Sequence, residues 1–223
     1  METKLNQIER RVLGVLMEKA LTQPDYYPMT VNAVVIACNQ KSNRDPVMDL
    51  DELAVLDTLE SFKRRGLVGQ VLPAPGARVD RYKHLAESCW GWSARQRAIM
   101  TELLLRGPQT IGELRTHASR MIDFESLDIV NNVLETLMTG ESVWVAAMPR
   151  EPGRSAIRYT HLLYPEGEQM PAAALLAAIP TPVASLPGSH VESDRLAALE
   201  KQVADLHETL VELTSRLDRL EGR

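Results

Sequence analysis

The sequence has little of what secreted and membrane proteins depend on. Only two cysteines occur, Cys38 and Cys89, and they lie far apart, so we expect free thiols in a reducing compartment rather than a disulfide framework. No apolar run approaches the roughly 20 residues that cross a bilayer, and the polar N-terminus does not have the pattern of a signal peptide. These absences predict a soluble, cytoplasmic protein with no membrane partner.

Patterns typical of catalysis are also missing. None of the five histidines pairs with another His, Cys or Glu at metal-ligand spacing. Neither a glycine-rich phosphate loop nor a nucleophile elbow occurs. The sequence therefore predicts a protein that is not an enzyme and has no metal site and no cofactor.

A surplus of positive charge is absent as well. The net charge is −5, and the segment from Ser185 onward holds 8 acidic and 5 basic residues, so it contributes −3 and leaves −2 for the rest. The basic balance usual in nucleic-acid-binding proteins is missing. Any contact with nucleic acid would need a local basic patch.

What the chain does have is a short sequence motif that occurs twice. Arg81–Leu85 reads R-Y-K-H-L and Arg158–Leu162 reads R-Y-T-H-L, and a Pro-Gly pair precedes each, at Pro75-Gly76 and Pro152-Gly153. Both pairs share one offset (159 − 82 = 152 − 75 = 77). A fixed offset indicates an internal duplication, and we expect Tyr82 to superpose on Tyr159.

The pattern of each copy predicts three helices followed by a β-hairpin, which is the element order of a winged helix. In that fold the third helix enters a DNA groove and the hairpin is called the wing. Val55–Leu59 is echoed by Val133–Leu137 at an offset of 78, which predicts that one residue is lost before the second hairpin. Trp90 and Trp92 flank the junction between the copies, where packing is a better interpretation than base stacking.

The predicted fold class is mainly α with small β-hairpins (α+β). We expect a first winged-helix domain over 1–88, a second over 89–164, a Pro/Ala-rich linker over 165–188 and a coiled-coil helix over 189–223. The last segment has apolar residues at alternating spacings of three and four, which predicts a coiled coil and a homodimer. Complementary charges, Arg195 with Glu200 and Arg216 with Glu221, favour a parallel pair; an antiparallel pair and an amphipathic helix folded back on its own body stay open. The predicted dimerisation residues are Leu196, Leu199, Val203, Leu206, Leu210, Leu213, Leu217 and Leu220.

Two segments carry a resemblance to a known family. Cys38–Met48 resembles a long and unusual signature of the bacterial YceH family, and Leu104–Thr110 with Gly112–Arg115 resembles its second signature. Ile111 stands where many relatives have proline, which should affect only the start of a helix. The similarity covers about residues 5–164 and implies a tandem winged-helix protein, often with a coiled-coil tail; it implies no activity.

DNA binding, with a role in transcriptional control, is the first hypothesis. Cations on the two wings occupy matched positions, and further cations lie at the end of the third helix of the first copy. The polar loop before that helix has two interpretations: it contacts phosphates, or its side chains only satisfy the backbone of the loop. The candidate nucleic-acid-binding residues are Lys41, Asn43, Arg44, Lys63, Arg64, Arg65, Arg78, Arg81, Lys83, Arg150, Arg154 and Arg158.

The alternative is a scaffold for a protein partner. Both predicted third helices are rich in Asp and Glu, and a carboxylate in the major groove faces phosphates at a cost. Such helices suit a protein partner, as in the kleisin-binding subunits of bacterial condensins, which the predicted fold resembles. DNA binding is the preferred hypothesis, because two basic wings at matched positions are a more specific signal than two acidic helices.

Overall fold

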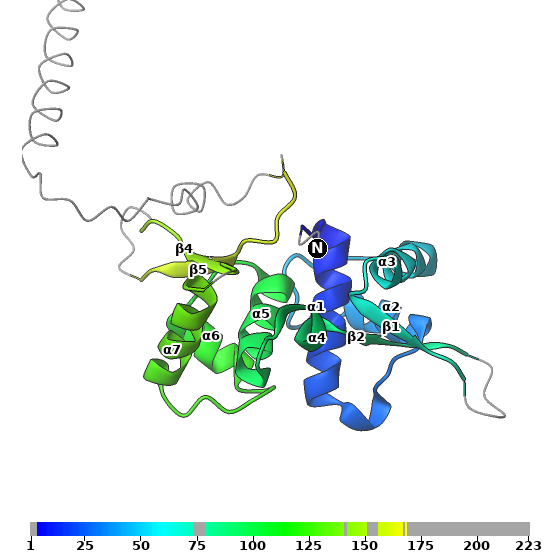
Figure 1. The fold of residues 1–223 in the computed structure, drawn as a ribbon, viewed down its shortest axis with the longest axis horizontal. Helices are drawn as coiled ribbons and strands as arrows, with labels where there is room; N and C mark the ends of the chain where they lie inside the picture. The colour runs from blue at the N-terminus through cyan, green and yellow to red at the C-terminus, as the bar shows by residue number, and fades with distance from the viewer. Residues whose placement is uncertain (1–3, 74–78, 141, 151–155, 167, 169–223) are drawn as a thin grey trace, which may run out of the picture. The chain divides into compact units, whose positions relative to one another are not determined.

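The computed structural model describes residues 4–73, 79–140, 142–150, 156–166 and 168. Helices and small antiparallel sheets make up this part of the chain, in agreement with the predicted α+β class (Figure 1). Most of the predicted linker and all of the predicted coiled-coil helix lie outside the described residues.

The first half begins with three helices. Asn6 caps the first of them through a reciprocal capping box with Glu9, and Thr30 and Asp51 cap the other two, which satisfies amide groups that a helix start leaves without partners. The elements are α1 (Gln7–Thr22), the 3₁₀ turn η1 (Pro24–Tyr26), α2 (Val31–Cys38), α3 (Glu52–Arg64), β1 (Val68–Val71) and β2 (Arg81–His84).

The second half repeats this order after a short connecting helix. Its sheet has the strand order β3-β5-β4, and the first half has a single bridge, Met29 to Tyr82, where β3 would correspond. The elements are α4 (Ala86–Trp90), α5 (Ala94–Arg106), β3 (Gln109–Thr110), α6 (Ile111–Ala118), α7 (Leu127–Met138), β4 (Val145–Ala147) and β5 (Arg158–His161).

The two hairpins share one register. Val68 pairs with His84 in the first and Val145 with His161 in the second, so both members shift by the same number (145 − 68 = 161 − 84 = 77). Tyr82 and Tyr159 both lie on the second strand of their hairpin. The prediction that the two repeated motifs occupy equivalent positions is confirmed for the strands.

The predicted alignment of the third helices is wrong. The N-caps Asp51 and Ser126 differ by 75, and at that offset the buried Val55, Leu59 and Phe62 match the buried Val130, Leu134 and Leu137. Three residues turn a helix by about 300°, nearly a full turn, so the apolar stripe looks similar at offsets of 75 and 78. The second copy therefore gains two residues before its hairpin instead of losing one.

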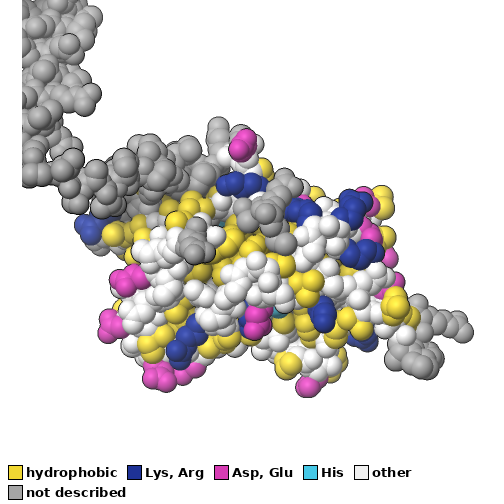
Figure 2. Space-filling model, in the orientation of Figure 1, with side chains coloured by type: hydrophobic (Ala, Val, Ile, Leu, Met, Phe, Trp, Pro, Cys, Tyr) yellow, Lys and Arg dark blue, Asp and Glu magenta, His cyan; other side chains and the backbone are white. Residues whose placement is uncertain are grey.

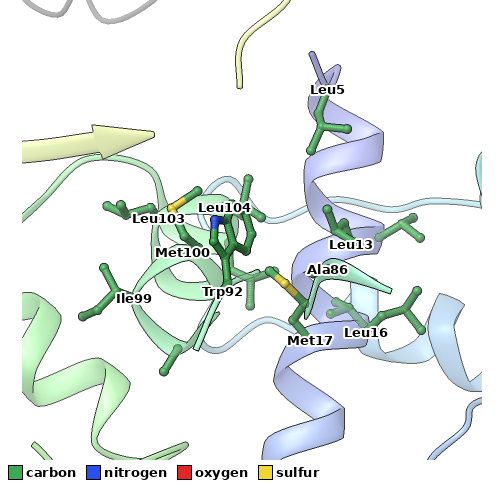
Figure 3. Packing of buried hydrophobic residues seen from close by; sticks show 14 of the residues in the cluster. Leu5, Leu13, Leu16, Met17, Ala86, Trp92, Ile99, Met100, Leu103 and Leu104 are labelled. Atoms are coloured by element: carbon green, nitrogen blue, oxygen red, sulfur yellow. The ribbon is translucent and has the colours of Figure 1, made fainter. Parts of the chain in front are cut away.

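The two halves pack along their first helices. The helices α1 and α5 lie against each other between the two halves (Figure 1), and the buried residues form one apolar cluster that includes both halves (Figure 3). Gly14 allows the close approach, because a Cβ there would lie 2.9 Å from the Leu105 side chain. The described residues all belong to one compact unit, and the predicted boundary between residues 88 and 89 falls inside α4.

The three tryptophans of the chain pack together beside this contact. The ring centroid of Trp92 lies 4.3 Å from that of Trp90 and 5.2 Å from that of Trp144. Trp92 is only 2% exposed, so stacking on a nucleic-acid base is excluded for it. Packing at the junction, the predicted role, is confirmed.

Candidate functional site

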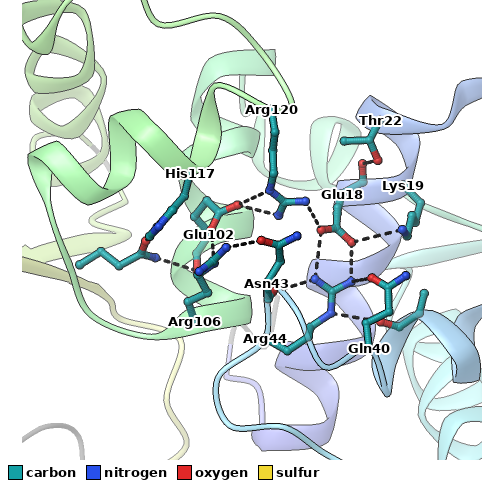
Figure 4. Close-up of polar contacts among 12 residues, drawn as sticks. Glu18, Lys19, Thr22, Gln40, Asn43, Arg44, Glu102, Arg106, His117 and Arg120 are labelled. Atoms are coloured by element: carbon teal, nitrogen blue, oxygen red, sulfur yellow. Dashed lines mark hydrogen bonds and ion pairs between the residues drawn. The ribbon is translucent and has the colours of Figure 1, made fainter.

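A buried ion-pair network joins the two halves (Figure 4). Glu18 projects from α1, and the Arg44 guanidinium donates two hydrogen bonds to its carboxylate, at 3.0 Å to Oε1 and 2.5 Å to Oε2. Both side chains are at most 1% exposed. Arg44 also donates to the Ala37 carbonyl and to Oε1 of Gln40.

Arg120 brings the second half into this network, which we call the joint. Its Nη1 donates to Oε1 of Glu18, and its Nη2 donates to Oε1 of Glu102 at 2.6 Å. Nε of Arg106 lies 3.1 Å from Oε2 of Glu102, and its Nη2 donates to Oδ1 of Asn43. Two carboxylates therefore hold arginines from both halves together.

Glu18 and Arg120 keep their charges at neutral pH. Burial by itself would raise the pKa of Glu18, but hydrogen bonds and charge from Arg44 and Arg120 outweigh it, so the pKa is lowered. Burial likewise opposes the charged form of Arg120, and Glu102 and Glu18 overcome it and raise its pKa. Such a network holds its geometry as long as every partner is present.

The two signature segments of the predicted family meet at the joint. The amide of Asp45 donates to the Leu105 carbonyl at 2.9 Å, and Arg106 contacts Asn43. Arg11 donates to the carbonyls of Cys38 and Pro46 and so fixes both ends of the loop. The first signature thus supplies one backbone and one side-chain contact to the second half.

This geometry corrects part of the predicted nucleic-acid surface. Arg44 is buried and paired with Glu18, so no phosphate can reach it. Asn43 adopts a left-handed backbone with φ 60° and accepts from Arg106, while Lys41 is exposed. Of the two interpretations of the loop, the structural one fits both residues: Asn43 contacts Arg106 of the second half, and Arg44 holds Glu18, which Arg120 of the second half also contacts.

The wing arginines have the same structural partner in both halves. Nη1 of Arg81 donates to the Pro28 carbonyl at 2.8 Å, and Nη1 of Arg158 donates to the Pro108 carbonyl at 2.6 Å. Both prolines lie two residues before the threonine that caps the second helix, Thr30 or Thr110. The repeated P-x-T spacing in the sequence was the signal for this pairing, and it was missed.

The wing histidines also have matching partners. Nδ1 of His84 accepts from the amide of Ala86, and Nδ1 of His161 accepts from the amide of Leu163. Burial, reinforced by nearby cations, lowers the pKa of His84 to about 4 and that of His161 to about 3. Both imidazoles are therefore neutral at pH 7 and hold the turn after each hairpin.

The remaining predicted cations divide into paired and exposed groups. Lys63 is paired with Glu60 at 2.6 Å, and Arg65 with Glu9 at 2.6 Å. Within the described residues, the predicted cations that are exposed to solvent and have no carboxylate partner are Lys41, Arg64, Arg81, Lys83 and Arg150. Arg78 and Arg154 lie outside the described residues.

The outer faces of both third helices are acidic. The exposed carboxylates before and along α3 and α7 are Asp49, Asp51, Glu52, Asp57, Asp123, Glu125, Asp128 and Glu135. Apolar Val47, Leu53 and Leu127 are exposed among them at 58%, 66% and 46%. In Figure 2, acidic side chains gather along the edge of the molecule where Figure 1 places α7.

The described residues hold neither a membrane-spanning helix nor a cluster of metal-binding side chains. No helix in this part of the chain is long and apolar enough to cross a membrane. Its His, Cys, Asp and Glu side chains form no group of three that could hold a metal ion.

Sequence reasoning missed the residues that make the joint, apart from Arg44 and Asn43. Glu18 and Glu102 lie within the apolar stretches of the two first helices, and a charge at such a position is rarely buried unless it is paired. The position of these two glutamates in apolar stretches was therefore a signal in the sequence that each has a buried partner. It could not indicate Arg120 as the shared partner, because Arg120 is 102 residues from Glu18 in the chain.

The described residues thus form a twofold repeat of helices and hairpins around a buried joint. The chain matches the family model described as "Protein of unknown function, DUF480" over residues 5–154. It belongs to this family, also named UPF0502, which is the YceH family that the two signatures resemble.

Several relatives align over nearly their whole length. The UPF0502 protein of Geotalea uraniireducens is 43% identical over 100% of this chain and 99% of the relative. UPF0502 protein GSU0233 of Geobacter sulfurreducens is 44% identical over 92% of this chain and 91% of the relative. The UPF0502 protein of Aeromonas hydrophila is 41% identical over 100% of both chains.

Proposed function

We propose that this chain is a non-enzymatic tandem winged-helix protein that binds a basic partner protein through the acidic outer faces of α3 and α7. The order of three helices and a hairpin in each half supports the winged-helix assignment. The observation that carries the function is the charge of the surface that a DNA-binding winged helix would place in the major groove.

That surface is unsuited to phosphate. Along α3 the exposed Glu52 and Asp57 have no cation partner within the described residues, and α7 has no lysine or arginine at all. Carboxylates facing a groove are repelled by the phosphates on both sides, and cytosine alone offers them a donor in the groove. A basic protein surface removes that repulsion, and Leu53 and Leu127 add apolar area to bury.

The contacts of the wing cations support DNA binding less than their matched positions in the sequence suggest. Arg81 and Arg158 already bond to the carbonyls of Pro28 and Pro108, and Arg158 also pairs with Glu113 at 3.3 Å. Their repetition between the halves is therefore explained by folding, without a ligand.

A pair of double variants tests the proposal on the full chain. Glu52→Lys with Asp57→Lys reverses the charge of α3 without touching its cap, and Arg64→Glu with Lys83→Glu is the matched control on the neighbouring basic surface. After cross-linking in cells and quantitative mass spectrometry, the partner should be lost with the first pair and kept with the second. Loss with the control pair alone would contradict the proposal.

DNA binding in transcriptional control is the second candidate. The exposed Arg64 and Lys83 favour it, together with the predicted contact Arg78. Fluorescence anisotropy with a mixed-sequence duplex at low and high salt measures it: each phosphate interaction that Arg64→Glu with Lys83→Glu removes should reduce the salt slope by about 0.9. No binding by the unmodified chain at low salt would end this candidate.

We also propose a homodimer through the apolar repeat of residues 196–220, which lies outside the described residues. Light scattering on the full chain should give twice the monomer mass, and Leu206→Glu with Leu213→Glu should halve it, because a charge at a d position opposes burial of the seam. A monomeric unmodified chain at micromolar concentration would contradict the dimer.

A further inference from the structure

A surface cavity of about 270 Å³ lies beside the joint, between the end of α1, η1 and α2. Its apolar wall includes Met29, Ala33 and Ile36, and its polar lining includes Lys19 and Gln40. The rim residues Tyr26 and Ile36 are 77% and 61% exposed. The volume exceeds the roughly 150 Å³ of a cavity that accommodates benzene.

The joint next to this cavity carries more positive than negative charge. Lys19, Arg44, Arg106 and Arg120 face only two carboxylates, Glu18 and Glu102, among the residues labelled in Figure 4. Cations removed from water are costly unless anions balance them. An anion that enters the cavity would reduce this imbalance.

Lys19 is the cation that such an anion would meet. Its Nζ lies 3.8 Å from Oε2 of Glu18, the same oxygen that Arg44 holds at 2.5 Å. Its side chain is 11% exposed, and burial lowers the pKa of its ammonium group. Lys19 therefore combines a poorly compensated charge with a place in the cavity lining.

Gln40 offers a second donor at the same place. Its Oε1 accepts from Nη2 of Arg44 at 3.0 Å, which fixes the orientation of the carboxamide. The Nε2 group is then left as a donor with no partner among the described residues. One ammonium and one amide N–H beside an apolar wall suit a carboxylate attached to a compact apolar body.

We propose that this cavity binds a small aromatic or branched aliphatic monocarboxylate. The apolar body lies against Ala33, Ile36 and Met29, and the carboxylate accepts hydrogen bonds from Nζ of Lys19 and Nε2 of Gln40. Because Gln40 and Glu18 both contact Arg44, the bound anion adds to the network that joins the halves. This site is separate from the partner surfaces on α3 and α7 and does not depend on them.

Isothermal titration calorimetry of the full chain tests this with benzoate and with its uncharged analogue benzamide. Benzoate should bind saturably and at least about ten-fold more tightly than benzamide, because a charge-assisted hydrogen bond is worth about that factor. Lys19→Met should abolish the preference for benzoate, and Ala33→Leu should fill the cavity and weaken both ligands. Lys41→Met, an exposed lysine in the next loop, is the matched control and should bind as the unmodified chain does.

Circular dichroism and the urea midpoint check that each variant is folded, and Ala33→Leu keeps the test valid if Lys19→Met unfolds the joint. No saturable binding of benzoate by the unmodified chain would overturn the proposal. Equal binding of benzoate and benzamide would do the same, as would unchanged benzoate binding in both variants.

Discussion

The two halves of the molecule agree in their strands and differ in the segments between their second and third helices. The hairpins match pair for pair, and the amides of Leu85 and Leu162 donate to the matched carbonyls of Leu67 and Trp144, both at 2.8 Å. The connecting segments are unequal, residues 39–51 in the first half and 119–126 in the second. The longer one folds into the joint.

The difference shows what holds the two halves in one compact unit. Each connecting segment sends one arginine to the centre, Arg44 from the first and Arg120 from the second, and both meet Glu18. The strands are alike because each half forms its own hairpin, whereas the connecting segments differ because each makes its own contacts to Glu18.

Breaking the joint should have the largest effect on stability. Arg44→Met leaves the buried Glu18 carboxylate with only part of its compensation, which should cost about 3–5 kcal/mol in the free energy of unfolding. Urea denaturation of the full chain measures it, and the exposed Lys41→Met in the same segment should change stability by no more than about 0.5 kcal/mol. Equal midpoints for the two variants would mean that the joint adds no stability.

The wing histidines should make both halves sensitive to acid. Their folded pKa values lie near 4 and 3, below the ordinary 6.5, so their contribution to stability is complete above pH 6.5 and is lost as the pH falls toward the folded values. Between pH 6.5 and 4.5 each should account for roughly 2 kcal/mol of the loss. Urea midpoints of His84→Asn and His161→Asn across this range should fall less steeply; an unchanged slope would contradict the lowered pKa values.

The same glycine substitution should have opposite effects at two helical sites. Gly14→Ala places a Cβ against the buried Leu105 where α1 meets α5 and should destabilise by about 1–2 kcal/mol. Gly112→Ala in α6 meets nothing within 4 Å and should stabilise by up to about 1 kcal/mol. Thermal denaturation compares the two, and a stabilising Gly14→Ala would show that the first helices can separate without cost.

The smallest effects should come from the wing arginines, and they should be alike in the two halves. Arg81→Met and Arg158→Met each remove a hydrogen bond to a proline carbonyl, which should cost about 0.5–1.5 kcal/mol. Arg158→Met also removes the partly exposed pair with Glu113 at 3.3 Å, which should add no more than about 1 kcal/mol. Arg81→Lys and Arg158→Lys should lose less stability than the methionine variants, because lysine can still reach the carbonyl. They should nevertheless be less stable than the unmodified chain, because an ammonium group does not have the planar geometry of the guanidinium. A loss for one arginine only, in urea titrations of both, would break the equivalence of the wings.

The sequence by itself determined the local features of this protein. The helix caps follow from residues three apart, as at Asn6 and Glu9, and the shared hairpin register follows from a motif repeated at one offset. Such features depend on neighbours in the chain or on alternation along a strand, which a sequence displays directly.

Tertiary structure alone decided which charges are free. Arg44 and Lys41 lie three residues apart in one polar loop, yet Arg44 is 6% exposed and paired while Lys41 is exposed. The same holds for the register of the third helices, because a shift of almost one turn leaves the apolar stripe in place. Burial and ion pairing depend on groups that are distant in the chain, such as Glu18 and Arg120, and only the folded chain brings them together.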